Sequence, residues 1–251
     1  MRRLWMSLLL VPVMVAAMAS AAWASPAASA ARTAAAARTA PAARTQAAAS
    51  ASALQPGMTG AQVKALQRRL AALKYYPGKI DGNFGTNTLE AVWAFYEVQG
   101  LTPHNYVSSA MKRALAHPRA PKVLVRHPGA NRIEISLSRE VLVLYRNNKV
   151  QLISHVSTGG HYYFCNPRGG CGYAVTPTGN FRTRVFMRGW VHVPLGEMYN
   201  PVFFIGTAYA IHGDTYVPLA PVSHGCVRIP MDIAAFFHKL VKVPGEPVYI
   251  R

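Results

Sequence analysis

The chain carries two short stretches near its C-terminus, Ile211-His212-Gly213 and Ser223-His224-Gly225-Cys226-Val227-Arg228. A cysteine thiolate is a strong nucleophile, and a neighbouring histidine is the usual means of generating it near neutral pH. Glycine beside the cysteine allows a sharp turn whose backbone can approach an oxyanion closely. The two stretches therefore predict a nucleophilic thiol in a small-residue turn, supplied with two imidazoles.

The sequence around these motifs has the pattern of a mostly β domain. Apolar residues alternate with polar ones from Ile133 to Leu137, residues 141–145 and 150–156 are β-rich, and Asn147-Asn148 between them offers a turn. Residues 248–250 form a predicted last strand. One helix is predicted over residues 231–241, with an apolar face made of Ile233, Phe236, Phe237 and Leu240. About 130 residues are enough for a core of their own.

Five blocks in residues 122–251 resemble the catalytic domain of the L,D-transpeptidases. They are residues 131–137 (NRIEISL), 156–159 (VSTG), 176–181 (TPTGNF), 211–213 (IHG) and 223–228 (SHGCVR). A single His-Gly-Cys would be a weak signal, whereas five blocks in family order are a strong one. The resemblance implies a sandwich of β-sheets with a cysteine nucleophile that acts on the stem peptides of peptidoglycan. The fold class expected for the chain is α+β and multidomain.

The resemblance also implies the course of the reaction. Cys226 would attack the carbonyl of the third residue of a tetrapeptide stem, D-alanine would leave, and an amine would resolve the thioester. The product is a 3→3 crosslink or an attached protein. His212 is the implied base, with the Gly213 carbonyl holding its other ring nitrogen, while His224 shapes the site. The N–H groups of Gly225 and Cys226 are the expected oxyanion donors.

Three further residues are expected at the substrate. Arg228 offers a guanidinium that either clamps a stem carboxylate or braces the loop. The Ser223 hydroxyl is expected to cap the loop, or to contact substrate, and Tyr199 falls where a pocket wall would lie. No cofactor is expected. A zinc site built from the two motif histidines and the cysteine does not match the usual ligand spacings, so no metal is expected either.

The three cysteines support this assignment of the thiol. An exported protein with three cysteines is expected to pair two and leave one. Cys165 and Cys171 are close enough in sequence to close a small loop, so we predict a disulfide between them and a free Cys226. The loop falls between the VSTG and TPTGNF blocks, inside an insertion relative to shorter family members. The sequence leaves open whether it borders the substrate cleft.

Residues 54–117 have helical patterns instead. Thr59-Gly60-Ala61-Gln62 fits a capping box ahead of an amphipathic helix, a second helix follows the turn at 81–85, and Ser108 is a candidate cap for a third. This stretch resembles the peptidoglycan-binding domain found beside many wall enzymes. The resemblance rests on Gly60-x-x-Val63-x-x-Leu66-Gln67-x-x-Leu70, Asp81-Gly82-x-x-Gly85-x-x-Thr88, Ala91-Val92-x-x-Phe95 and Gly100-Leu101. These residues are interpreted mainly as core and turn formers, and a small three-helix module is predicted.

The N-terminus predicts export. Residues 1–24 combine two arginines, a broken apolar run and Ala22-Trp23-Ala24, which together are typical of a signal peptide. Residues 25–53 are almost all Ala, Ser, Thr, Pro and Arg and predict a disordered basic linker. No other segment is long and apolar enough to span a membrane. The expected location is the periplasm or cell wall, with a part in wall biogenesis and cell shape.

The formal net charge of +18 favours a polyanionic neighbourhood. No nucleic-acid-binding motif is present, so the expected partners are stem peptides, glycan strands and anionic wall polymers. Two other functions stay open: a carboxypeptidase-type hydrolase that uses water as acceptor, and a non-catalytic wall-binding protein. The histidines outside the motifs are interpreted as surface or satisfied core residues, with His192 left open. They are His104, His117, His127, His155, His161 and His238.

Overall fold

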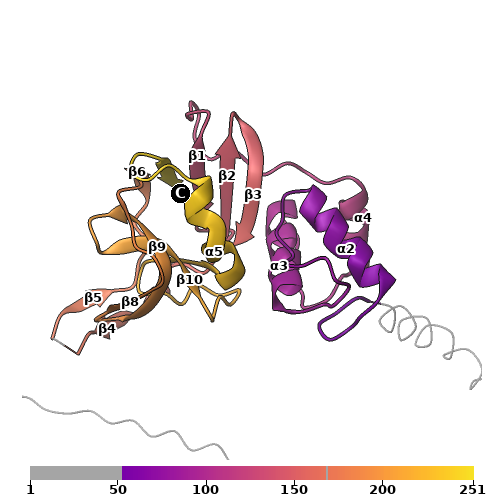
Figure 1. The fold of residues 1–251 in the computed structure, drawn as a ribbon, viewed down its shortest axis with the longest axis horizontal. Coiled ribbons are helices and arrows are strands. Elements are labelled where there is room, and N and C mark those ends of the chain that lie inside the picture. Colours follow the sequence, from indigo (N-terminus) through magenta and orange to yellow (C-terminus); the bar gives the residue numbers. More distant parts are fainter. Residues whose placement is uncertain (1–52, 168) are drawn as a thin grey trace, which may run out of the picture. The chain divides into compact units, whose positions relative to one another are not determined.

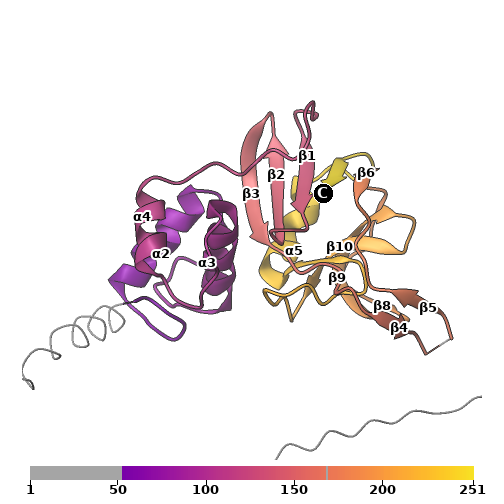
Figure 2. The same cartoon turned by 180° about the vertical axis from the view of Figure 1, so that it is seen from behind.

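A computed structural model describes residues 53–167 and 169–251 (Figures 1 and 2). The predicted signal peptide and all of the predicted linker except its last residue lie outside these ranges. All of the described residues belong to one compact unit of the chain. Across the described ranges, none of the helices has both the length and the apolar character that a membrane span requires.

The N-terminal part of the described chain is a three-helix module. Its helices are α2 (Ala61–Ala72), α3 (Thr86–Gln99) and α4 (Ser109–Ala116). The predicted capping box at the first helix is wrong: the N-cap residue is Gly60, which has no side chain to donate or accept, and Thr59 instead forms a β-bridge with Asn83. Ser108 caps α4 as expected, because its Oγ accepts a hydrogen bond from the Met111 N–H at 3.1 Å.

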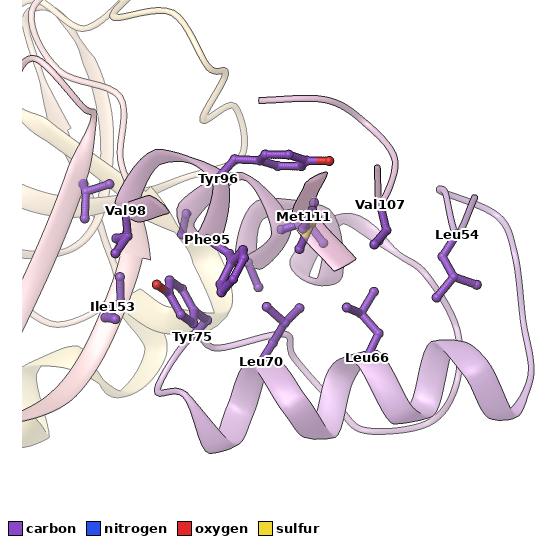
Figure 3. Packing of buried hydrophobic residues seen from close by; sticks show 14 of the residues in the cluster. Leu54, Leu66, Leu70, Tyr75, Phe95, Tyr96, Val98, Val107, Met111 and Ile153 are labelled. Atoms are coloured by element: carbon purple, nitrogen blue, oxygen red, sulfur yellow. The ribbon is translucent and has the colours of Figure 1, made fainter. Parts of the chain in front are cut away.

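The module has an apolar core that extends onto the neighbouring sheet. Leu70 of α2 and Tyr75 lie against Phe95 of α3, and the two rings meet edge to face with centroids 5.4 Å apart (Figure 3). Ile153 of the β domain belongs to the same cluster. Helix α3 is therefore buried on nearly all sides, because one side faces α2 and another faces a strand. A helix that is buried in this way carries apolar residues around more of its circumference than a surface helix does.

Several of the motif residues in this module hydrogen-bond to one another. The buried Gln67 side chain donates to the Asn83 carbonyl at 2.9 Å and to the Thr88 hydroxyl at 3.1 Å, and its Oε1 accepts from the Gly82 N–H at 2.9 Å. Gly82 has a φ of 89°, which glycine adopts without strain. Gln67 and Gly82 therefore brace the turn between α2 and α3, in agreement with their interpretation as core and turn formers.

The rest of the described chain is mainly β. One sheet has the order β3-β2-β1-β12-β6, the second has the order β11-β10-β9-β7 with β8 paired to β9, and β4 pairs with β5 in a separate hairpin. The strands are β1 (Arg132–Ser136), β2 (Val141–Arg146), β3 (Lys149–His155), β4 (Tyr163–Cys165), β5 (Cys171–Tyr173), β6 (Gly179–Arg182), β7 (Val185–Phe186), β8 (Trp190–Val193), β9 (Gly196–Ile205), β10 (Tyr209–Asp214), β11 (Val227–Pro230) and β12 (Pro247–Ile250).

The predicted hairpin at the start of this domain is present. β1, β2 and β3 pair in antiparallel fashion, and Asn147 and Asn148 both adopt positive φ in the turn between β2 and β3. This pair of conformations is typical of a tight two-residue hairpin turn. The last strand, β12, pairs in parallel with β1 on one side and antiparallel with β6 on the other, so the C-terminal strand lies inside the sheet beside the first strand.

Helix α5 (Met231–Leu240) and the facing sides of the two main sheets share a second core. Ile233 and Phe237 of α5 are fully buried in it, while Phe236 and Leu240 are partly buried at its edge. Because α5 directly follows β11, this packing fixes the end of the strand that begins just after Cys226. The helix runs along β9 and β10 in both views (Figures 1 and 2).

Candidate active site

Strands β10 and β11 bring the two C-terminal motifs together. They pair in parallel, with Ile211 opposite Val227 and His212 opposite Arg228. Cys226 directly precedes β11, and successive strand residues alternate between the two faces of a sheet. Continuing the register by one residue places Cys226 opposite Ala210, so Cys226, Arg228 and His212 share one face.

A cavity of about 410 Å³ opens on this face. Five of the residues predicted from the sequence line it: Cys226, His212, His224, Ser223 and Arg228. The walls also include residues that sequence reasoning missed, among them Phe164, Asn166, Glu197, Met198, Ala208 and Asp214. No sequence motif marks these residues, although Phe164 and Asn166 flank the predicted disulfide. A ligand in the cavity would contact both imidazoles and the thiol.

Tyr199 occupies a different place from the one expected. It lies in β9 opposite Gly213, and its ring packs at 5.3 Å from the ring of Trp190. It is absent from the lining of the cavity among the described residues. Gly213 itself has little room: an added Cβ would lie 2.6 Å from the Ala234 Cβ of α5. Glycine at this position allows β10 to approach the helix closely.

His212 is held in a defined tautomer. Its side chain is buried, and Nδ1 lies 2.9 Å from the Gly213 carbonyl oxygen, the hydrogen bond expected from the sequence. A carbonyl only accepts, so Nδ1 carries the proton of this bond. Burial, and secondarily the positive Arg228, lower the pKa of His212 against the opposing effects of the Gly213 bond and Asp214. The ring is therefore neutral at physiological pH, with the lone pair on Nε2.

The surroundings of Cys226 favour the neutral thiol over the thiolate. Burial raises the pKa of Cys226, while the Ala210 N–H and the charge of Arg228 oppose the rise. The sulfur lies 3.7 Å from the Ala208 carbonyl oxygen, to which the S–H donates. It is the free cysteine, since Cys165 and Cys171 form the predicted disulfide.

Ser223 organises the turn that carries the cysteine. Its hydroxyl donates to the Cys226 carbonyl at 2.6 Å and accepts from the Gly225 N–H at 3.0 Å. The expectation that the Gly225 N–H serves as an oxyanion donor is therefore wrong for this structure, because that N–H is already engaged. Gly225 has a φ of 135°, and a Cβ there would lie 2.7 Å from the Val175 carbonyl oxygen.

The two upstream motif blocks support the same turn. The Thr176 hydroxyl donates to the Gly225 carbonyl at 2.8 Å and accepts from the Gly159 N–H at 2.9 Å. Ser157 forms a β-bridge with Arg228, and Gly159 forms one with Ser223. The blocks that are far apart in sequence are thus neighbours around the cysteine turn.

Arg228 and His224 stand on either side of the thiol in sequence. The Arg228 Nε lies 3.1 Å from the Asp214 carboxylate, and a second guanidinium nitrogen donates to the Tyr216 carbonyl at 3.4 Å. The half-buried ring of His224 lies edge to face with Phe164 and Tyr162, at centroid distances of 4.7 and 5.6 Å. Partial burial, followed by the charge of Arg228, lowers the pKa of His224.

Within residues 53–167 and 169–251, no three histidine, cysteine, aspartate or glutamate side chains gather closely enough to hold a metal ion. The chemistry available in the cavity is that of a half-buried thiol, a neutral imidazole with a free nitrogen, and a guanidinium.

Comparisons with known proteins agree with this arrangement. The L,D-transpeptidase catalytic domain family matches residues 130–250, and the peptidoglycan-binding domain family matches residues 59–115. A search of curated proteins found no match. The crystal structure of an L,D-transpeptidase from Xylanimonas cellulosilytica is 31% identical, with a TM-score of 0.73, over 79% of this chain and 97% of that one.

A second solved structure, an L,D-transpeptidase from Stackebrandtia nassauensis, is 19% identical with a TM-score of 0.46, over 78% of this chain and 94% of that one. Its TM-score is too low for this structure to support the family assignment. The Xylanimonas structure supports the family assignment, because its 31% identity extends over 79% of this chain. The chain therefore belongs to the L,D-transpeptidase family of enzymes and carries an N-terminal peptidoglycan-binding domain.

Proposed function

We propose that the chain is a cell-wall L,D-transpeptidase in which Cys226 forms a thioester with a peptidoglycan stem peptide. The observation that carries this proposal is the shared cavity of Cys226, His212 and Arg228, with the lone pair of His212 on Nε2. The carbonyl of the third residue of a tetrapeptide stem is the electrophile. An amine on a second stem, or on a protein, is the acceptor.

His212 moves the proton in both halves of this reaction. Its Nε2 takes the proton from the Cys226 sulfur as that sulfur attacks the carbonyl carbon. The buried imidazolium readily gives the proton up, because burial lowers its pKa, and it protonates the nitrogen of D-alanine as the peptide bond breaks. His212 then removes a proton from the acceptor amine as it attacks the thioester carbonyl, and gives that proton to the Cys226 sulfur as the carbon–sulfur bond breaks, which restores the thiol and the neutral imidazole.

The resting thiol needs the substrate for its activation. Burial raises the pKa of Cys226, so proton transfer to His212 is expected together with carbonyl attack and not before it. The Cys226 N–H is the oxyanion donor that we propose, since the Gly225 N–H is engaged by Ser223. Arg228 retains donors beyond those used by Asp214 and Tyr216, and these suit a stem carboxylate.

We further propose that the protein works outside the cytoplasm, at the cell wall. The disulfide between Cys165 and Cys171 supports this location, because such bonds persist in oxidising compartments. The match to a peptidoglycan-binding domain supports glycan strands as a partner. The predicted signal peptide and basic linker are consistent with it, although they lie outside the described residues.

Product analysis tests the reaction. The mature protein is incubated with disaccharide-tetrapeptide and the products are weighed by mass spectrometry. Crosslinked dimers with loss of D-alanine are expected, and Cys226→Ala is expected to abolish them. Tripeptide monomers alone would show that water is the acceptor and that the enzyme is a hydrolase. An unchanged rate in Cys226→Ala would overturn the thioester mechanism.

A further inference from the structure

The hairpin β4–β5 is unused by the mechanism above, yet it borders the same cavity. Its register pairs Tyr163 with Tyr173, Phe164 with Gly172, and Cys165 with Cys171. Because strand residues alternate in direction, Phe164 points to one side and its neighbours Tyr163 and Cys165 to the other. Phe164 is half-buried and lines the cavity, whereas Tyr163 is 86% exposed.

Phe164 is fixed between a glycine and an active-site histidine. A Cβ on the opposite residue, Gly172, would lie 3.0 Å from the tip of the Phe164 ring, so the ring lies over a position where a side chain is missing. Its other contact is the ring of His224, edge to face at 4.7 Å. Tyr162 meets the same imidazole at 5.6 Å and donates its hydroxyl to the Val222 carbonyl at 3.2 Å.

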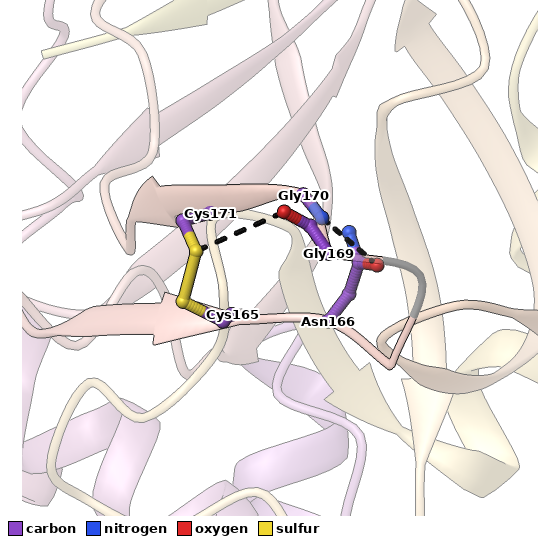
Figure 4. The surroundings of a disulfide bond; sticks show 5 residues. All are labelled: Cys165, Asn166, Gly169, Gly170 and Cys171. Atoms are coloured by element: carbon purple, nitrogen blue, oxygen red, sulfur yellow. Dashed lines mark hydrogen bonds between the residues drawn. A yellow bond between two sulfur atoms is a disulfide. The ribbon is translucent and has the colours of Figure 1, made fainter.

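The disulfide closes the hairpin one register position from Phe164 (Figure 4). Within the enclosed loop, the Asn166 N–H donates to the Gly170 carbonyl at 2.8 Å, and the Gly170 N–H approaches the Asn166 Oδ1 at 3.4 Å. At the base of the hairpin, the Gly160 N–H donates to the Ser223 carbonyl at 2.9 Å. The hairpin is thus tied to itself at one end and to the cysteine turn at the other.

We propose that the disulfide-closed hairpin is a wall of the substrate site, in which Phe164 contacts the stem peptide and positions His224. The inference rests on the proposed function for the identity of the stem peptide, but the contact with His224 is independent of it. Phe164 is a positioning and specificity-determining residue, since the reacting sulfur and its base belong to other elements. The disulfide holds the hairpin in the geometry that Phe164 needs.

The contact with His224 gives the proposal a spectroscopic signature. The charged groups that line the cavity are Arg228, Asp214 and Glu197, together with the titratable Cys226, His212 and Tyr209, and Tyr162 packs against the ring itself. None of them is altered when Phe164 is replaced. Partial burial lowers the pKa of His224, and the Phe164 ring supplies part of that burial. Removing the ring is therefore expected to raise the pKa of His224 toward its ordinary value.

The test compares Phe164→Ala with Tyr163→Ala, its neighbour on the outer face. Phe164→Ala is expected to raise the KM for disaccharide-tetrapeptide about tenfold, the usual range for lost apolar contacts in a pocket. It is also expected to move the NMR titration of the His224 ring to higher pH. Tyr163→Ala should change neither KM nor the His224 titration, and Phe164→Tyr should keep both close to their wild-type values. Equal behaviour of Phe164→Ala and Tyr163→Ala in both measurements would overturn the proposal.

The disulfide is tested with the double variant Cys165→Ser/Cys171→Ser. It is expected to shift KM and the His224 titration in the same direction as Phe164→Ala, by a smaller amount. If both quantities match the wild type, the disulfide has no part in the wall. Failure of the proposed function is recognised separately, because a wild-type protein that makes no product would still report the His224 titration.

Discussion

Two buried histidines, in two regions of the molecule, have pKa values that are shifted in opposite directions. His212 lies in the cavity beside the thiol, and burial lowers its pKa. His155 lies at the end of β3, where the β domain meets helix α3, and its pKa is raised. Burial lowers the pKa of both rings, so the difference must come from their partners.

The partners of His155 are acceptors on both sides of the ring. Nδ1 lies 2.8 Å from a carboxylate oxygen of Glu97, and Nε2 lies 3.1 Å from the Pro218 carbonyl oxygen. Both ring nitrogens can donate at once only in the imidazolium form. His212 has an acceptor on Nδ1 alone, so it remains a neutral base. The neutral ring of His212 suits the proton transfer that we propose, whereas the ring of His155 joins the β domain to helix α3.

Replacing His212 with Asn gives the largest expected effect. Because the proton acceptor is lost, kcat/KM should fall by a factor of about 10² to 10⁴. The thermal unfolding midpoint is measured alongside turnover, so that loss of the base can be separated from loss of the fold. His127→Asn, at an exposed position, is the control and should keep full activity. A folded His212→Asn protein with wild-type turnover would remove the base from the mechanism.

Replacing Glu97 with Ala is expected to act on stability. It leaves the charge of His155 buried without a partner, which costs about 3 to 5 kcal/mol of unfolding free energy. Urea denaturation measures the loss. The control is the exposed pair His192 and Glu197, with atoms 2.7 Å apart, where His192→Ala should cost about 0 to 1 kcal/mol. Similar losses of unfolding free energy in Glu97→Ala and His192→Ala would show that the buried pair stabilises the protein no more than the exposed pair does.

The pH dependence of stability tests the buried carboxyls and His155 together. Burial raises the pKa of Glu90 and Glu140 from 4.5 to about 7. The folded protein therefore keeps protons that the unfolded chain releases, and this stabilisation is present below about pH 4.5 and lost as the pH rises through about 7. His155, whose pKa is also raised, acts in the same direction.

We expect each of the Glu90 and Glu140 carboxyls to lower the unfolding free energy by roughly 1 to 3 kcal/mol between pH 5 and pH 7.5. Urea denaturation at a series of pH values measures it. Glu140→Gln, which is neutral at every pH, should flatten the dependence. Stability that instead increases over this interval would show that the carboxyls titrate normally.

The smallest expected effect concerns Asp214. Its charge raises the pKa of His212 and opposes the effect of burial. Asp214→Asn should therefore move the acid limb of the kcat/KM profile to lower pH, by less than about one unit for a single partly exposed charge. A limb that moves to higher pH would contradict the electrostatic description of the cavity.

Local sequence pattern was enough for most of the elements. The alternation from Ile133 to Leu137, the Asn147-Asn148 turn and the apolar face of α5 depend on neighbouring residues only, and all three are present in the structure. The capping box at Thr59 failed because a four-residue match cannot show that the same segment forms a β-bridge with Asn83. Pairings between distant segments are invisible to such patterns.

The same distinction holds at the candidate site. A nucleophilic Cys226 supplied with two histidines follows from residue types and motif spacing, whereas the choice of His212 as the base came from the resemblance to the L,D-transpeptidases. The pairing of Cys165 with Cys171 follows from their closeness in an exported chain that has three cysteines. The sequence did not predict three other features of the site. These are the hydrogen bond that occupies the Gly225 N–H, the position of Tyr199 away from the cavity, and the packing of Phe164 against His224. Each depends on the direction in which a side chain or N–H points after distant strands have paired.

The amino-acid sequence by itself determined which side chains are available for chemistry and where most of the helices and strands lie, because both depend on residue type and short-range periodicity. Tertiary structure alone decided the charge of each buried histidine and the contact of the disulfide hairpin with the active site. The physical reason is that a pKa depends on burial and on acceptors within a few ångströms, and these come from residues such as Glu97 and Pro218 that lie far from His155 in the chain.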